Sequence, residues 1–298
     1  MKKISDIGEF GFIDLIKKQI GSSSIIKGIG DDTAVVNFSA DKYLLLTTDM
    51  LVEGVHFTRA MSAKAIGHKA IGCNISDIAA MGGLPKYAVV SIGLSGNLSI
   101  KFATDIYAGM NQLAKKFGVV IVGGDTVKSS KLIINVALTG EVKKDKVVLR
   151  SGAKKGDQIF VTGALGKSFS SGRHLTFTPR LLPSQYLVKH FKPTAMIDIS
   201  DGLAADLGHV LEESNVGAII DEKCIPRHQG ASFNNALHDG EDFELLFTLS
   251  RAQAQRLKSK KDFKFYHIGE ITSDKNKLRL IDKFGQSRIL GQKGFVHF

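Results

Sequence analysis

Residues Val119–Asp125 (VVIVGGD) form an apolar run that ends in two glycines and a carboxylate. Two further stretches have the same design: Leu44–Asp49 (LLLTTD) ends in two hydroxyls and a carboxylate, and Met196–Gly202 (MIDISDG) carries two aspartates. Gly28–Asp32 (GIGDD) leads into a fourth apolar segment. Short apolar runs bounded by turn residues predict buried strands. Each strand is therefore expected to deliver oxygen ligands to one of its ends.

Carboxylates in this arrangement are typical of a magnesium site. Magnesium takes oxygen ligands and keeps several waters, so scattered aspartates indicate several ions around a polyphosphate. The adjacent glycines let backbone amides approach phosphate oxygens. A single aspartate after a strand is often only a turn or helix-cap residue. Asp198 argues against that interpretation, because a charged group inside a buried strand is costly unless it is paired. Asp77 lies on a similarly apolar helical face.

Strand-like and helix-like segments alternate through both halves of the chain, which predicts mixed α/β (α+β) domains. Apolar periodicity and capping residues predict the following helices: Glu9–Gln19, Ser62–Met81, Ser99–Phe117, Ser184–Phe191, Leu203–Ser214 and Arg251–Lys258. The polar, lysine-rich segment Lys143–Asp157 interrupts the pattern. It predicts two domains, residues 1–145 and residues 146–298.

Composition narrows the class of protein. The 298 residues are 43% hydrophobic and 23% charged, which suits a large core and argues against disorder. A net charge of +11 is compatible with binding nucleic acid or anionic small substrates. Lysine pairs such as Lys143-Lys144 and Lys154-Lys155 lie in predicted loops without interleaved aromatics. They indicate a solvated face, and no nucleic-acid partner is expected.

The cysteines and the apolar runs predict a cytoplasmic protein. Cys73 and Cys224 are far apart in sequence and indicate reduced thiols. The chain has no apolar run of membrane-spanning length, and its first residues lack the apolar stretch of a signal peptide. No membrane partner is expected.

Gly163–Ser168 (GALGKS) imitates a phosphate-binding P-loop, since it follows a predicted strand and ends in Gly-Lys-Ser. A P-loop requires a glycine five positions before the Gly-Lys pair. Val161 occupies that position. The sequence therefore predicts that ATP, if used, is bound by a metal-rich site and that Lys167 is not the main phosphate lysine.

Several short motifs follow one another in a fixed order along the chain. They are Gly8–Phe10, Gly28–Asp32, Thr48-Asp49 with Glu53–Phe57, Asn74–Gly82, Gly123–Thr126, Arg150–Ala153, Ile197–Leu203 and Gly240–Leu245. This ordered set resembles the thiamine-monophosphate kinase family from about residue 8 to the C-terminus. The block around His56 separates that family from its relatives.

The resemblance implies a two-domain aminoimidazole ribonucleotide synthetase-like fold. It implies an N-terminal ATP/Mg-binding and dimerisation domain (1–145) and a C-terminal α/β domain (146–298). It also implies a homodimer joined through the N-terminal sheets. ATP as co-substrate and several Mg²⁺ ions are expected in a cleft between the domains.

The resemblance also assigns site residues by position. Those that match metal-site residues are Asp32, Thr47, Thr48, Asp49, Asp77, Asp125, Asp198 and Asp201. Those near ATP are Gly124, Asp125, Arg150 and Ser200, and those near the thiamine phosphate are His56, Glu241 and Phe295. A carboxylate and an aromatic ring suit a cationic aromatic substrate. No catalytic residue distinct from these ligands is expected.

The implied reaction transfers the terminal phosphoryl group of ATP, in line, to thiamine monophosphate and gives thiamine diphosphate. The acceptor is already an anion and needs no strong base, while the metals and Arg150 reduce the repulsion between two polyanions. The main alternative is another ATP-using enzyme of this fold, acting on an amide, a carboxylate or selenide. Selenide chemistry favours a reactive cysteine near the N-terminus, and none is present there. A nucleic-acid-binding protein is the alternative from another class, but it leaves the aspartates unexplained.

Two departures from the family pattern concern the substrate pocket. The segment Lys167–Lys189 is shorter than usual, and Asp239 stands where many members have glycine. Both lie in the C-terminal half, so they bear more on the shape of the substrate pocket than on the metal site.

Overall fold

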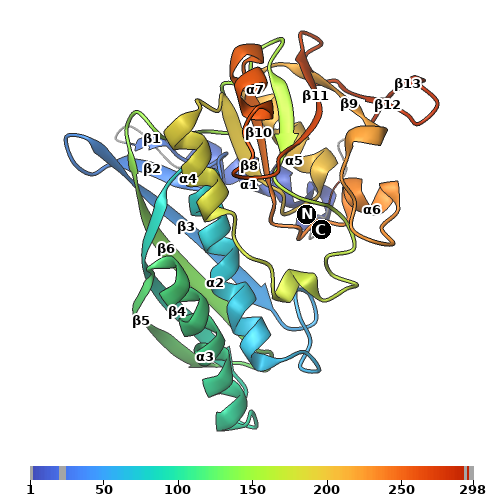
Figure 1. The fold of residues 1–298 in the computed structure, drawn as a ribbon. Helices are drawn as coiled ribbons and strands as arrows, with labels where there is room; N and C mark the ends of the chain where they lie inside the picture. The colour runs from blue at the N-terminus through green and yellow to red at the C-terminus, as the bar shows by residue number, and fades with distance from the viewer. Residues whose placement is uncertain (1–2, 20–24, 292–293, 295–298) are drawn as a thin grey trace.

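Two β-sheets, one from each half of the chain, organise the molecule (Figure 1). The computed structural model describes residues 3–19, 25–291 and 294. The first sheet has the order β1-β2-β3-β6-β4-β5, and the second has the order β13-β12-β9-β11-β7-β10-β8. Mixed sheets with helices packed on them confirm the predicted α/β (α+β) class.

The first sheet is antiparallel except for the parallel pair β4–β5. Its strands are β1 (Ile25–Lys27), β2 (Ala34–Asn37), β3 (Lys42–Val52), β4 (Leu84–Leu94), β5 (Val120–Lys128) and β6 (Ile133–Lys143). Along β6, buried and part-exposed residues alternate, with Ile134, Val136 and Leu138 facing the core. This period of two is expected when only one face of a sheet is covered.

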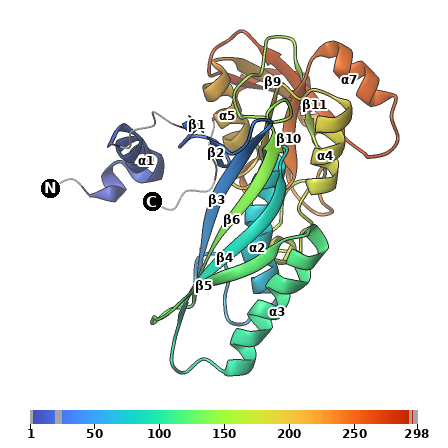
Figure 2. The ribbon, with the colours of Figure 1, turned by 90° about the vertical axis from the view of Figure 1, so that its left-hand side faces the viewer.

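Two long helices, α2 (Ala63–Ala80) and α3 (Ile100–Phe117), cover that inner face (Figure 2). The helices approach each other closely at two glycines. A Cβ added at Gly67 would lie 1.9 Å from the carbonyl oxygen of Ile106, and one at Gly109 would lie 1.9 Å from that of Lys64. Any larger residue at either position would push the two helices apart.

The outer face of the same sheet is apolar and open. Exposed large side chains on β3, β4 and β5 include Leu46, Met50, Tyr87, Val89 and Val122, each at least 40% exposed. The sheet is seen from this side in Figure 2. Contiguous apolar surface of this kind marks an interaction site in soluble proteins.

The second sheet is covered on both faces. Its strands are β7 (Gln158–Val161), β8 (Ala195–Asp198), β9 (Gly217–Asp221), β10 (Leu245–Leu249), β11 (Tyr266–Thr272), β12 (Leu278–Ile281) and β13 (Ser287–Ile289). Helix α5 (Leu203–Ser214) and α6 (Phe233–His238) lie on one face, and α4 (Leu181–His190) and α7 (Arg251–Lys258) lie on the other. Every residue of β10 is buried, as expected for a strand covered on both sides.

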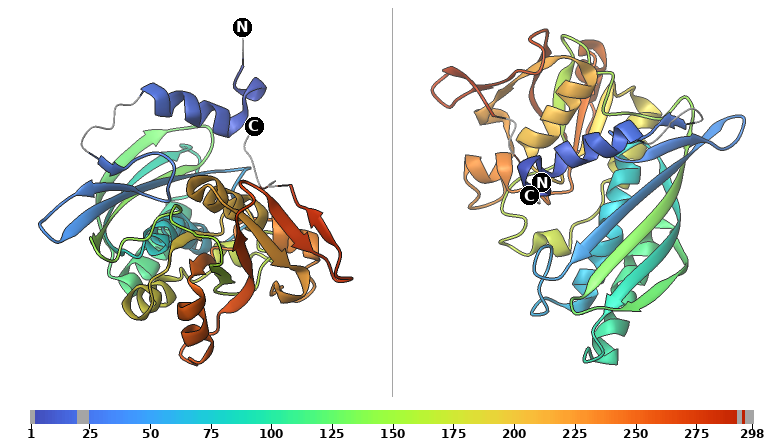
Figure 3. Two further views of the ribbon diagram at one scale, coloured as in Figure 1. Left: turned by 90° about the horizontal axis from the view of Figure 1, so that it is seen from above. Right: turned by 180° about the vertical axis from the view of Figure 1, so that it is seen from behind.

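The remaining short elements are α1 (Gly8–Gln19) and the 3₁₀ turns η1 (Ile4–Asp6), η2 (Arg173–Leu175) and η3 (Glu222–Cys224). Helix α1 crosses the face that is seen from behind in the right panel of Figure 3. The ring centroid of its Phe10 lies 5.1 Å from that of His209 on α5. Within the described part of the chain, no helix combines the length and apolar character that crossing a bilayer requires.

The predicted helices are confirmed to within three residues at each end. Two strand predictions need correction. Strand β3 continues to Val52 and β5 continues to Lys128, so Asp49 and Asp125 lie within strands and do not end them. Backbone pairing with β6 and β4 continues past each aspartate, because ladder hydrogen bonds do not depend on the side chain. Helix α6 and strand β13 were not predicted, since both are short and polar.

Candidate active site

A cavity of about 570 Å³ lies where the two halves of the chain meet. Strand β3 and helix α2 from the first half line it, together with residues that follow β8 and precede β10 in the second half. Eight of the residues predicted for the site line it, namely Thr48, Asp49, His56, Asp77, Asp198, Ser200, Asp201 and Glu241. The fold therefore gathers most of the predicted residues around one hollow.

Three carboxylates from three different elements converge at one end of this region. Oxygen atoms of Asp32, Asp77 and Asp198 lie within 4.8 Å of one another. Thr47 donates to Asp77 Oδ2 over 2.5 Å, and Ser76 donates to Asp198 Oδ2 over 2.6 Å. A hydroxyl thus orients the carboxylates of Asp77 and Asp198.

The electrostatics of this cluster favour a cation. Burial, followed by repulsion from Asp32, raises the pKa of Asp198 to about 8. Burial likewise raises the pKa of Asp49 to about 6, with Lys69 opposing the shift. Asp32 Oδ2 and Asp49 Oδ2 are buried and have no hydrogen-bond partner among the described residues. Buried carboxylate oxygens left in this state are suited to a hard divalent cation, so the donor set fits magnesium.

Arg150 closes one side of the cluster. Its Nη2 donates to Asp32 Oδ1 over 2.8 Å, and its backbone N–H donates to both oxygens of Asp31 over 3.1 and 3.2 Å. Burial, followed by repulsion from Asp32, raises the pKa of Asp31 to about 7. Arg150 Nε is buried without a partner in the described chain, which leaves this guanidinium donor available to an anion.

The two threonines of β3 point in opposite directions, because side chains alternate along a strand. Thr47 faces inward and donates to Asp77. The exposed Thr48 directs its hydroxyl toward Val136 O and Asn135 Oδ1 on β6, at 3.2 Å each. Only the first of these hydroxyls joins the carboxylate cluster.

Ser200 and Asp201 lie in the loop between β8 and α5. Asp206 on α5 accepts hydrogen bonds from the backbone N–H groups of Asp201 and Gly202, at 3.1 and 3.0 Å. Gly202 has φ = 110°, which a residue with a side chain rarely adopts. Oxygen or nitrogen atoms of Asp201, Asp206 and His209 form a second group within 4.8 Å. Asp206 therefore fixes the loop that presents Asp201 to the cavity.

Gly124 and Asp125 are not brought into this cluster. Both are exposed on β5, the edge strand of the first sheet. Asp125 pairs with Ser91 on β4, which pairs with Asn135 on β6, which pairs with Met50 on β3. Three strand spacings of about 4.8 Å place Asp125 roughly 14 Å from β3. Within one chain, these two predicted residues stand apart from the rest.

Two of the predicted acceptor residues, His56 and Glu241, line the same cavity. His56 Nδ1 accepts from Val52 N over 3.0 Å, which orients the loop after β3. Glu241 has φ = 52°, an unfavourable value for a residue with a side chain, and its N–H donates to Ser200 O over 2.6 Å. Phe295 lies outside the described residues.

Sequence analysis did not predict Lys69 or Phe169, which line the cavity, and it named Asp239 only as a departure that bears on the shape of the pocket. Lys69 stands eight residues before Asp77, and Cys73 stands midway, so all three share one face of α2. That spacing from a predicted ligand is a signal that could have identified Lys69. Phe169 comes from the shortened segment, where the sequence carries no comparable pattern.

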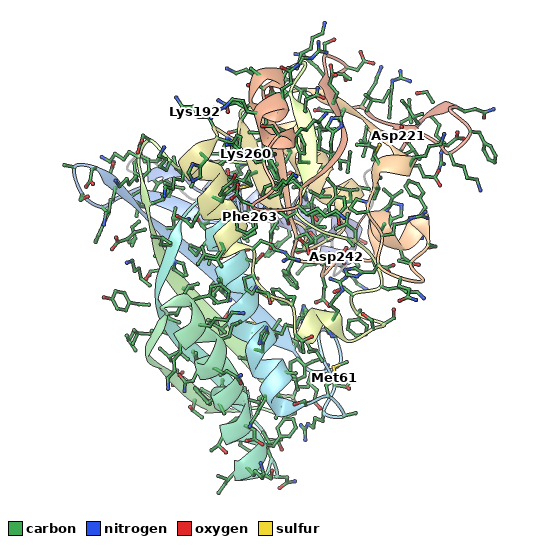
Figure 4. All side chains as sticks on the ribbon, viewed as in Figure 1. Met61, Lys192, Asp221, Asp242, Lys260 and Phe263 are labelled. Carbon is green, nitrogen blue, oxygen red and sulfur yellow. The ribbon has the colours of Figure 1, made fainter. Side chains whose placement is uncertain are left out.

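The backbone N–H groups of the Gly-Lys-Ser turn donate to carboxylates of the same chain. Gly166 N donates to Asp242, at 2.9 and 3.1 Å from its two oxygens, and Lys167 N donates to Asp239 Oδ2 over 2.9 Å. Asp242 is buried and is labelled near the centre of the view in Figure 4. A P-loop needs such amides for phosphate, so this geometry supports the prediction that the turn is not one.

Comparisons with known proteins agree with this geometry. Residues 30–142 match the family model for the AIR synthase related protein, N-terminal domain. The chain is 38% identical to the thiamine-monophosphate kinase of Aquifex aeolicus over 83% of its own length and 87% of the relative's. It is 36% identical to that of Bacillus subtilis over 97% and 99% of the two lengths.

Solved structures extend the likeness to three dimensions. AaThiL complexed with AMPPCP and TMP superposes with a TM-score of 0.86 at 34% identity, covering 100% of this chain and 99% of that one. The hydrogenase maturation protein HypE in complex with ATP shares the fold, with a TM-score of 0.73 at 20% identity, covering 97% of this chain and 92% of that one. The ordered motifs, the shared fold and the extent of these matches mean that the chain belongs to the thiamine-monophosphate kinase family.

Proposed function

We propose that the protein transfers a phosphoryl group from ATP to thiamine monophosphate and forms thiamine diphosphate. One observation carries the proposal. The cavity is lined by crowded carboxylates and also by Glu241, His56 and aromatic rings. The carboxylates match a polyphosphate with its cations, and Glu241 with the rings matches a cationic aromatic acceptor. The AaThiL complex with an ATP analogue and TMP supports this choice of substrates.

The crowded carboxylates of the cavity region form a suitable ligand set for magnesium. The proposed ligand set is Asp32, Thr47, Thr48, Asp49, Asp77, Asp125, Asp198 and Asp201, with Gly124, Asp125, Arg150 and Ser200 near ATP. When bound, such ions neutralise the charge that develops on phosphate oxygens. The orphaned oxygens of Asp32 and Asp49 support this part of the proposal most directly.

The side chains of the protein act mainly by binding and orientation. Phosphoryl transfer between phosphates has little covalent chemistry for a protein to perform, and charge stabilisation with in-line positioning supplies most of the rate. Arg150 is locked by Asp32 and Asp31, so its remaining donors are preorganised for an anion. The acceptor is already anionic at the attacking oxygen, and no side chain is assigned as a base.

We propose that the protein works as a homodimer joined through the first sheet. The exposed apolar face of β3, β4 and β5 supports this arrangement, because burying it removes a large apolar surface from water. A two-fold interface on this face would also bring β5 of one subunit toward the other subunit. Asp125 and Gly124 would then complete the partner's site, which accounts for their separation from the cluster within one chain.

We also propose a domain boundary, a cellular location and the absence of two classes of partner. The domain boundary is placed at residue 145, between β6 and β7. The location is cytoplasmic, which the free Cys73 and Cys224 support. Nucleic acid and membranes are not partners.

The experiment that tests the function is a chromatographic assay of both products. With ATP, magnesium and thiamine monophosphate, ADP and thiamine diphosphate should appear in equal amounts. Unphosphorylated thiamine should not substitute, because its alcohol needs a base that the site does not supply. Free phosphate released in step with ADP would instead indicate an ATP-using reaction of another type.

A further inference from the structure

Lys69 is a buried cation that the assigned function does not yet use. Its side chain is 1% exposed, although it lines the cavity. Among the described lining residues it is the one lysine or arginine, against seven carboxylates. A buried ammonium is costly unless it is paired, so its partners indicate its role.

Those partners come from the two halves of the chain. Lys69 Nζ donates to the carbonyl oxygen of His56 over 3.0 Å and forms a close ion pair with Glu241 Oε1. His56 belongs to the loop after β3, whereas Glu241 belongs to the segment that leads into β10. Helix α2 thus joins the His56 loop to the segment before β10 through one side chain.

Glu241 is left with one oxygen for a ligand. Its Oε1 accepts from Lys69, while its Oε2 is buried and has no hydrogen-bond partner among the described residues. The left-handed backbone of Glu241 costs about 1 kcal/mol or more, so this conformation must be held by its contacts. The pair with Lys69 is one of those contacts, and the N–H to Ser200 O is another.

We propose that Lys69 is a positioning residue, which orients Glu241 and the His56 loop so that Glu241 Oε2 receives the heterocyclic part of the acceptor. This inference rests on the proposed function. Thiamine monophosphate carries a cationic thiazolium ring and an amino group on its pyrimidine, and a carboxylate oxygen attracts both. Lys69 neutralises the other oxygen and fixes the direction of the free one.

The test compares Lys69→Met, which keeps the length of the side chain, with Lys69→Arg, which keeps the charge. Lys64→Met is the matched control, because Lys64 is exposed on the same helix. Lys69→Met should raise KM for thiamine monophosphate about 30-fold, a size typical of losing one partner of a buried charged pair. KM for ATP at saturating magnesium should stay within about twofold, since the direct contacts of Lys69 are with Glu241 and the His56 loop, which are proposed to bind the acceptor. Lys69→Arg should recover part of the loss, and Lys64→Met should match the unsubstituted protein.

A double-mutant cycle with Glu241→Gln separates positioning from simple stabilisation. Both single variants should raise KM for the acceptor, and the double variant should lose no more than the worse single one, because the two residues act as a unit. A purely structural lysine would lower Tm and leave the acceptor KM unchanged, and that result would overturn the inference. If Lys69→Met does not fold, Lys69→Arg and Glu241→Gln still decide the matter through the acceptor KM.

The outcome is distinguishable from failure of the function itself. If the unsubstituted protein makes no thiamine diphosphate, the proposed function fails. If it does, and Lys69→Met behaves like Lys64→Met, only the inference about Lys69 fails. A parallel rise in KM for ATP would likewise reject a role confined to the acceptor.

Discussion

The inner end of β3 and the exposed strand β5 carry similar sequence patterns but lie in opposite environments. Asp49 and Asp125 each follow an apolar run, yet Asp49 lines the cavity while Asp125 is exposed on an edge strand. Helix α2 covers the inner face of β3, while one side of β5 has no neighbouring strand in the described sheet. An aspartate at a strand therefore becomes a candidate ligand only when other elements converge on it.

The contrast between Asp49 and Asp125 predicts its largest effect at Asp49. Asp49→Asn should lower kcat about 10³-fold, because it removes a charge from a water-poor site that stabilises a transferring phosphoryl group. The magnesium concentration for half-maximal activity should also rise. Circular dichroism should report an unchanged fold, and Asp145→Asn, at an exposed carboxylate, should behave like the unsubstituted protein. Full activity of Asp49→Asn at limiting magnesium would remove Asp49 from the metal site.

The role of β5 can be sharpened by mixing subunits. Asp125→Asn alone should lower activity about 10²-fold. If Asp125 serves the partner's site, coexpressed Asp125→Asn and Asp49→Asn chains should form heterodimers in which one of the two sites is intact. The measurement is the specific activity of tagged heterodimers after separation, which should be about one half of full activity. Absence of any recovery would mean that Asp125 acts within its own chain or not at all.

The stability of the metal-free protein should depend on pH, because the carboxylates of the inner cluster are buried and close to one another. Folding raises the pKa of Asp198 to about 8 and of Asp49 to about 6, above their ordinary value of 3.8. Between pH 4 and pH 8 the folded chain therefore holds more protons than the unfolded chain, and the free energy of unfolding falls as pH rises. Tm should drop by several degrees across this range, and Mg²⁺ should restore it most strongly at the upper end.

A matched variant identifies the source of that slope. Asp198→Asn removes a charge that is costly at high pH, so without metal it should be more heat-stable than the unsubstituted protein at pH 8. Asp145→Asn, at an exposed surface carboxylate, should leave the slope of Tm against pH as it is in the unsubstituted protein. Equal slopes in both variants would contradict the assignment of the crowding to the inner cluster.

The smallest effect is expected at Lys167. This residue tests whether the Gly-Lys-Ser pattern or the carboxylates around it decide the role of the turn. The N–H groups of Gly166 and Lys167 already serve Asp242 and Asp239. Lys167→Ala should therefore change kcat less than about threefold, whereas a lysine central to phosphoryl transfer would cost roughly a thousandfold. Steady-state kinetics measures the difference, and a loss near the larger figure would restore the P-loop interpretation.

Local patterns predicted the secondary structure better than they predicted the ends of strands. Helices α3 and α5 were predicted almost to the residue, because apolar spacing and the left-handed caps Gly118 and Asn215 define them locally. The end of β3 was placed too early, at Thr48 and Asp49, since an aspartate after an apolar run is often a turn residue. Pairing with β6 continues across them, and a partner strand distant in sequence cannot be read from the pattern.

The sequence by itself determined the α/β class and the family, and it predicted a set of aspartates for the site. These follow from periodicity and from ordered motifs, which are properties of neighbouring residues. The tertiary structure decided which aspartates meet, which face of the first sheet stays open, and that Lys69 joins His56 to Glu241. Those pairings join residues up to 172 positions apart. They depend on how sheets and helices pack. Burial then sets the charge state of each group and decides which of its oxygen atoms lack a hydrogen-bond partner.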